Sequence, residues 1–134
     1  MKTEKIVDGN QILAIVIRSA DWEEGLNFVS SSEDYQQVGI WGYNKGQKLA
    51  AHIHVVVPRE IRHTQEVIFI KEGRVKADVY SHERKHIRSV ELCQGDTMIL
   101  LHGGHGYQIL EDNTKVLEIK NGPYIGAERD RERI

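Results

Sequence analysis

Histidine and glutamate occur in the middle of this chain at spacings that suit a metal ion. His52 and His54 are two residues apart in the run LAAHIHVVV, and Glu66 opens the run EVIFIKEG. Side chains two apart in a β-strand share a face, so both imidazoles point the same way if this run is a strand. His105 follows in the glycine-rich run HGGHG. Three imidazoles and one carboxylate facing one interior are a typical ligand set for a first-row transition metal.

Three nearby side chains are candidates for acid–base chemistry. His102 lies in the same glycine-rich run as His105 and competes with it for one ligand position. We favour His105 as the ligand because it begins the outgoing strand, and Tyr107 then shares its face as part of the pocket wall. His63 precedes Glu66 by three residues, a spacing that points it outward if the strand has begun. Tyr107, His102 and His63 are therefore the catalytic candidates.

Polar groups flank the expected site and could bind a substrate. Arg59 and Arg62 lie in the connection between His54 and Glu66. Two guanidinium groups at a pocket mouth can hold a carboxylate or a phosphate. Tyr43 and Tyr107 could add an aromatic wall or a phenol donor. We take these four residues as the candidate substrate-binding set, although solvated arginines and ordinary packing tyrosines are the competing interpretation.

The composition narrows the class of protein. The 134 residues carry a formal net charge of -2, with no basic patch of the kind that nucleic-acid binding requires. No apolar run approaches the ~18 residues of a membrane span, and the amino terminus lacks a signal-peptide pattern. Cys93 is the only cysteine, which excludes a disulfide framework. We expect a cytoplasmic protein with a small-molecule ligand and neither a nucleic-acid nor a membrane partner.

Short β-branched segments separated by turn residues predict an all-β chain in one domain, 1–134. The core is expected over about residues 10–120, and the charged tail 127–134 is expected to be loosely held. The expected strands are 11–19, 26–29, 38–43, 49–57, 66–72, 74–80, 87–92, 97–101, 107–111 and 115–120. The apolar strand around residues 12–17 is our candidate for pairing two copies into a homodimer.

The motifs together resemble the cupin superfamily, whose members are small jelly-roll barrels with a metal site in the barrel mouth. The first cupin motif is a glycine, then H-x-H, three or four residues, a glutamate, six residues and a glycine. Gly46, His52, His54, Glu66 and Gly73 follow this order, but eleven residues separate His54 from Glu66. This departure lengthens the connection between the two strands.

The second cupin motif is a glycine, five residues, P-x-G, two residues and a histidine. Gly95 is followed by five residues and then Leu101-His102-Gly103, so leucine replaces the proline, and His105 comes one residue early. The strings QVGIWGYNKGQKLAAHIH, TQEVIFIKEG, GGHG and IKNGPY resemble a group of single-domain cupins of unassigned activity. Such cupins are often encoded near surface-polysaccharide and sugar-nucleotide enzymes.

The resemblance implies a cupin-type jelly-roll β-barrel that holds one divalent ion (Fe, Mn, Ni or Zn) at His52, His54, Glu66 and His105. The ion would act as a Lewis acid, or activate oxygen if it is iron. A metal-dependent isomerase, epimerase or oxygenase acting on a small polar metabolite, for example a sugar derivative, is the first functional hypothesis. A non-catalytic ligand-binding module and a metal-independent sugar-nucleotide isomerase or epimerase are the alternatives.

Overall fold

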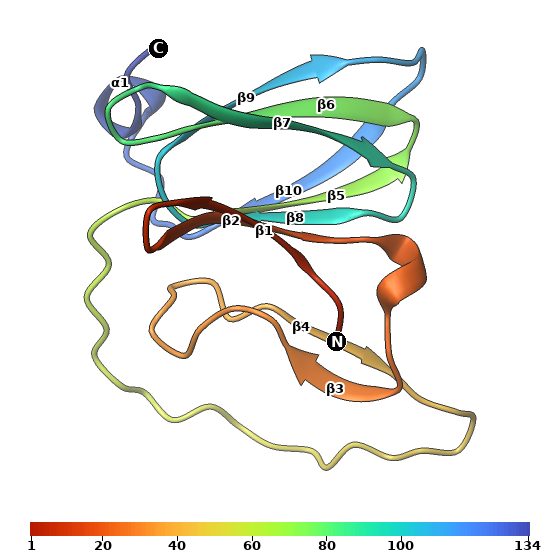
Figure 1. The fold of residues 1–134 in the computed structure, drawn as a ribbon. Helices are drawn as coiled ribbons and strands as arrows, with labels where there is room; N and C mark the ends of the chain where they lie inside the picture. The colour runs from red at the N-terminus through yellow and green to blue at the C-terminus, as the bar shows by residue number, and fades with distance from the viewer.

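The computed structural model describes residues 1–134 and shows ten β-strands with two short helical turns (Figure 1). The strands are β1 (Glu4–Asp8), β2 (Gln11–Ile17), β3 (Gly25–Phe28), β4 (Gly39–Gly42), β5 (Glu66–Glu72), β6 (Arg74–Tyr80), β7 (His86–Cys93), β8 (Thr97–Leu100), β9 (Gly104–Ile109) and β10 (Lys115–Lys120). The helical turns are η1 (Ser19–Asp21) and α1 (Ala127–Asp130). No helix is long and apolar enough to cross a bilayer. The predicted all-β class is confirmed.

Two antiparallel sheets face each other, and a separate hairpin lies outside them. The larger sheet has the strand order β1-β2-β8-β5-β10, and the smaller has the order β7-β6-β9. Strands β3 and β4 form the hairpin, which lies on the side of the larger sheet away from the smaller one (Figure 1). Strands β9 and β10 each end a sheet, so the two sheets do not close into a barrel along this side.

The core fills the space between the two facing sheets. Strands β5 and β6 alternate between inward and outward side chains, as a period of two requires. Ile68 and Ile70 of β5 face Val75, Ala77 and Val79 of β6, and all five are buried. The remaining members of this cluster are Ile6, Leu13, Ala14, Val16, Val90, Leu92, Met98 and Leu100.

A second cluster fixes the β3–β4 hairpin on the outer face of the larger sheet. Ile40 of β4 is only 5% exposed because it packs on Ile17, Val67 and other buried side chains of that face. Strand β2 is therefore buried on both faces, which explains its uninterrupted apolar sequence QILAIVI. Strand β2 also lies between β1 and β8. Our prediction that residues 12–17 pair two copies is wrong, because both hydrogen-bonding edges of that strand are occupied.

The predicted strand 49–57 is not formed. Residues 43–61, which we call the arm, contain no strand and run as a long extended segment from the end of β4 toward β5 (Figure 1). The physical reason is that no other strand lies beside the arm, and a strand persists only when its backbone groups are paired. Conversely, the short strand β1 was not predicted; Gly9, with φ of 56°, turns the chain so that β1 pairs with β2.

Candidate functional site

Glu66 is a buried carboxylate at the start of β5. In the larger sheet, Glu66 lies opposite Leu100 of β8 and Lys120 of β10. Its side chain shares a face with Ile68 and Ile70, so it points into the space between the sheets. Only 8% of Glu66 is exposed. A buried carboxylate is costly unless it is paired, so its neighbours decide its charge state.

His105 and Tyr107 of β9 supply two of those neighbours. His105 Nε2 lies 3.4 Å from Glu66 Oε2, and the Tyr107 hydroxyl donates a hydrogen bond of 3.5 Å to Glu66 Oε1. Burial opposes ionisation of Glu66, but the hydrogen bond and charge of His105, with the charge of Lys120, outweigh it and lower the pKa of the carboxyl. Glu66 is therefore an anion at neutral pH.

The pKa of the Tyr107 phenol is shifted in the opposite direction from that of Glu66. Although 41% of Tyr107 is exposed, its hydroxyl turns inward onto Glu66. Burial raises the pKa of the Tyr107 phenol, and the negative charges of Glu66 and Glu118 raise it further. Tyr107 therefore stays protonated and can donate a hydrogen bond to a bound oxygen atom.

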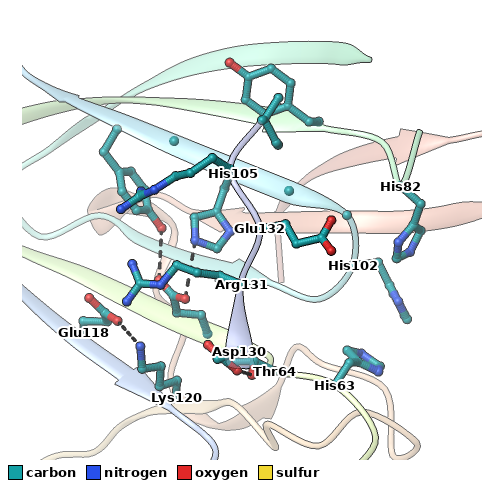
Figure 2. A pocket seen from close by; sticks show the side chains of 18 residues that line it. His63, Thr64, His82, His102, His105, Glu118, Lys120, Asp130, Arg131 and Glu132 are labelled. Atoms are coloured by element: carbon teal, nitrogen blue, oxygen red, sulfur yellow. Dashed lines mark hydrogen bonds and ion pairs between the residues drawn. The ribbon is translucent and has the colours of Figure 1, made fainter. Parts of the chain in front are cut away.

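These three side chains line a cavity of about 880 Å³ (Figure 2). Its walls are mostly polar and come from the start of β5, the first four residues of β9, the end of β10 and the carboxyl-terminal tail. The cavity is large enough for a small metabolite. His105 pairs with Val79 and Tyr107 with Ala77, so both lie on the face that strand parity predicted. Ile109 shares that face but is 58% exposed.

Three histidines gather at one side of the cavity. The ring centroids of His63 and His102 are 4.9 Å apart, and those of His82 and His102 are 5.9 Å apart. His63 Nε2 also lies 3.2 Å from the carbonyl oxygen of Leu101. Burial lowers the pKa of His102, and the charges of His63 and His82 lower it further, so His102 is neutral at neutral pH. His63 lines the cavity, against the outward direction that strand parity predicted, because β5 begins only at Glu66.

The carboxyl-terminal tail forms one wall of the cavity. Asp130 accepts a hydrogen bond of 2.6 Å from the Thr64 hydroxyl, and Glu132 pairs with Arg84 at 2.5 Å. Arg131 and Arg133 also line the cavity, and neither forms an ion pair. Arg131 extends across the cavity below His105 (Figure 2). The tail is therefore held against the two sheets by these contacts. This differs from our prediction, which took the charged tail to be loosely held.

The structure does not bring His52 and His54 to this cavity. Both lie on the arm and are exposed, with ring centroids 5.0 Å apart. No group of three or more histidine, cysteine, aspartate or glutamate side chains is placed to hold a metal ion. Two of the four predicted ligands, Glu66 and His105, are thus adjacent, while the other two lie together elsewhere.

Only one of the four predicted substrate-binding residues lies at the cavity. Tyr107 lines the cavity. Arg59 and Arg62 are exposed on and beside the arm, where Arg59 contacts the carbonyl of Val57 and Arg62 pairs with Glu60. Tyr43 packs against Trp41, with ring centroids 5.9 Å apart, and does not reach the cavity.

Several cavity residues were not found by sequence reasoning. Glu118 and Lys120 form an ion pair of 3.3 Å beside Glu66, and the tail adds Arg131 and Arg133. Alternation in the run KVLEIK places Glu118 and Lys120 on one face. The sequence does not show that β10 pairs with β5, and this pairing is what brings the two side chains beside Glu66. No local signal in the sequence indicated that the tail would reach the cavity.

The comparisons with known proteins do not identify a family. No protein-family model, no curated protein and no solved structure matches this chain.

Proposed function

We propose that this chain is a cupin-type jelly-roll protein that binds one divalent transition-metal ion and acts on a small polar metabolite. The observation that carries the proposal is the buried, ionised Glu66 beside His105 and Tyr107 in a polar cavity. Perturbed ionisable groups that converge in one cavity are typical of functional sites.

The donor set suits a metal ion, although the side chains are not assembled around one point. Glu66 and His105 provide an anionic oxygen and an imidazole nitrogen 3.4 Å apart. His52 and His54 would complete the shell if the arm folded over the cavity. A divalent ion held there supplies Lewis-acid chemistry to an oxygen of the substrate.

The unpaired cations of the cavity favour an anionic substrate. Arg131 and Arg133 lack acidic partners, and a guanidinium group binds carboxylate or phosphate through two hydrogen bonds. The phosphate or carboxylate of a sugar derivative fits this requirement. Arg59 and Arg62 join the same role only if the arm closes over the cavity.

Proton transfer is within the capacity of the remaining residues. Neutral His102 can accept a proton, and the protonated Tyr107 phenol can donate a hydrogen bond to a substrate oxygen that gains negative charge. His63 contacts His102 through its ring and orients it. A base and a hydrogen-bond donor that line one cavity favour isomerisation or epimerisation over oxygenation, for which neither group is needed.

A metal-independent isomerase or epimerase is the second candidate. The Glu66–His105 contact is complete without the arm, and a carboxylate beside an imidazole is the usual arrangement of an oriented general base. In this alternative His105 moves the proton, and Glu66 orients its ring.

Metal analysis separates the two candidates. The purified protein and the double variant His52→Ala/His54→Ala are compared for bound iron, manganese, nickel and zinc. We expect about one ion per chain in the wild-type protein and none in the variant, with unchanged circular dichroism, because both histidines are exposed. Full metal content in the variant would refute the ligand assignment. Isomerase activity in metal-free protein would favour the second candidate, and a ligand bound without turnover would indicate a binding module.

A further inference from the structure

One side of the sandwich is open and carries two exposed apolar side chains beside the polar cavity. Strand β9 pairs only with β6, and β10 pairs only with β5, so each has a free edge. Ile109 lies opposite the buried Val75, and Val116 lies opposite the buried Ile70, so both side chains face inward. Nevertheless, Ile109 is 58% exposed and Val116 is 40% exposed. Inward-facing apolar side chains with this exposure indicate that a neighbouring segment is missing from the open side.

The arm is the complementary feature of the same chain. Ile53, Val55 and Val56 are 90%, 75% and 97% exposed, respectively. The hydrogen bonds of residues 43–61 stay within the arm and its junction at Arg62. The arm thus presents unpaired backbone and apolar side chains to solvent, and its β-branched run has the composition of a strand.

The alternation of the arm suits the free edge of β9. An extended strand beside β9 would place His52, His54 and Val56 on one face and Ile53, Val55 and Val57 on the other. If the first face turned inward, the two imidazoles would share the interior with His105 and Tyr107. The other face would then cover the outer surface of the smaller sheet, where Gln108 lies.

The arm is held away from the free edge of its own chain. Ile40 fixes β4, from which the arm starts, on the outer face of the larger sheet. At the other end, Gln65 is 2% exposed and accepts hydrogen bonds from the backbone amides of Tyr35 and Gln36. Between these anchors the arm runs on the side of the larger sheet opposite to β9 (Figure 1). In this position the arm leaves the free edge of β9 in its own chain uncovered.

We propose that two copies of this chain exchange their arms, so that the arm of each copy forms a strand on the free edge of β9 in the other. The pairing satisfies unpaired backbone on both sides and covers the exposed apolar side chains of arm and edge. The exchange also completes the metal site, and this part of the proposal rests on the proposed function. The partner's His52 and the partner's His54 join Glu66 and His105 in that site. Each site is then shared by two chains.

Cysteine cross-linking tests the exchange without reference to metal. In a Cys93→Ser background, Val55→Cys is combined with Gln108→Cys, and the protein is treated with a short bismaleimide. Exchange predicts a covalent dimer on denaturing gels. The matched control combines Val55→Cys with Arg88→Cys, which lies on β7 at the opposite edge of the same sheet, and is expected to stay unlinked. Val55→Cys alone controls for links between two arms.

Each other result contradicts the exchange. An internal link with the mass of one chain would show that the arm folds onto its own β9. No link in the test pair, together with a monomer by light scattering, would show that the arm stays unpaired.

Complementation tests the shared site. Subunits carrying His52→Ala/His54→Ala are co-expressed with subunits carrying Glu66→Gln/His105→Ala under different tags, and the mixed dimer is purified through both tags. Exchange predicts one ion per mixed dimer, because one site receives all four ligands and the other receives none. No ion in a mixed dimer, with normal metal in the wild-type protein, would overturn the shared site. A cross-linked but metal-free wild-type protein would refute the proposed metal site and leave the exchange standing.

Discussion

Glu66 is the residue on which the interior site depends. Its carboxylate is removed from water and is stabilised by His105, Tyr107 and Lys120 rather than by solvent. A carboxylate with this burial keeps its charge only while those partners remain. Side chains that contact Glu66 should therefore contribute far more to metal affinity than cavity side chains that do not contact it.

The two histidines of the glycine-rich run provide the first test. His105→Ala should lower metal affinity at least 10-fold more than His102→Ala, since losses of ~10–100-fold are typical even for groups one contact away from a metal. His105 contacts Glu66, whereas His102 contacts His63 and His82. Competition with a chromophoric chelator measures both affinities. A larger loss for His102→Ala would move the metal to the histidine group and remove Tyr107 from its surroundings.

The arginines of the tail provide a second test at the same scale. Arg131→Glu/Arg133→Glu should weaken binding of a sugar phosphate or a dicarboxylate by ~10-fold or more, because charge reversal in a cavity is poorly screened. Arg59→Glu/Arg62→Glu reverses the same amount of charge on the arm, and Lys2→Glu/Lys5→Glu, two exposed residues outside the cavity, controls for net charge. Calorimetry measures all three variants. Equal losses in the two arginine variants would mean that the arm lies over the cavity, and no loss in either of them would mean that the arginines bind no anion.

Among the elements, β1, β7 and the β7–β8 turn are joined by one ionic network around Arg18, which follows β2. Arg18 donates hydrogen bonds to Glu4 at 2.8 Å and to Asp96 at 2.9 Å, and Arg88 of β7 contacts Glu4 at 3.1 Å. The hydrogen bond from Arg18 lowers the pKa of Glu4, burial opposes this effect, and the charges of Arg18 and Arg88 reinforce it. The network closes the sandwich on the side opposite to β9.

A lowered carboxyl pKa makes stability depend on pH in one direction. Glu4 stabilises the fold above its unfolded-state pKa near 4.5, and this contribution disappears as the pH falls through the lower folded-state value. Glu4→Gln should therefore reduce the free energy of unfolding at pH 7 by less than about 1 kcal/mol, as the pair is partly exposed. In urea unfolding, the difference between variant and wild type should shrink as the pH falls below 4.5. A constant difference down to pH 3 would argue against the ionic origin.

The glycine-rich bend between β8 and β9 makes a steric prediction. Gly103 has φ of 74°, and a Cβ atom there would collide with the carbonyl oxygen of Tyr80. Gly9 has φ of 56° with open space around it, so Gly9→Ala is the matched control for backbone strain alone. We expect Gly9→Ala to cost about 1–2 kcal/mol and Gly103→Ala to cost clearly more. Equal midpoints of urea unfolding would show that the bend yields to a methyl group.

At the scale of the whole molecule, arm exchange links stability to protein concentration. Two chains that complete each other's sheets unfold as one unit, so dilution favours the unfolded chains. A tenfold increase in concentration should raise the melting temperature by about 2–4 °C. Val55→Asp/Val56→Asp should abolish this dependence, since both side chains are exposed in the single chain. Scanning calorimetry over a hundredfold range of protein concentration measures this dependence of the melting temperature. A wild-type melting temperature that does not change with concentration would indicate a stable monomer.

Much of the fold follows from local pattern in the sequence. Alternation along β6, the double-sided apolar run of β2 and the turns at Gly73 and Gly95 predict strands and their limits without knowledge of neighbours, because side-chain period and backbone freedom are local properties. The same reasoning placed Glu66, His105 and Tyr107 on inward faces. For these three residues, local strand parity was enough to place the side chain on the correct face.

Tertiary structure decided the rest. The run around His52 and His54 has a strand composition, but a strand needs a hydrogen-bonding neighbour, and β4 is packed where the arm has none. The tail reached the cavity through Asp130 and Thr64, residues 66 positions apart whose meeting no local pattern indicates. Lys120 became a partner of Glu66 only because β10 pairs with β5. Local geometry sets the direction of each side chain, whereas long-range pairing sets what it meets.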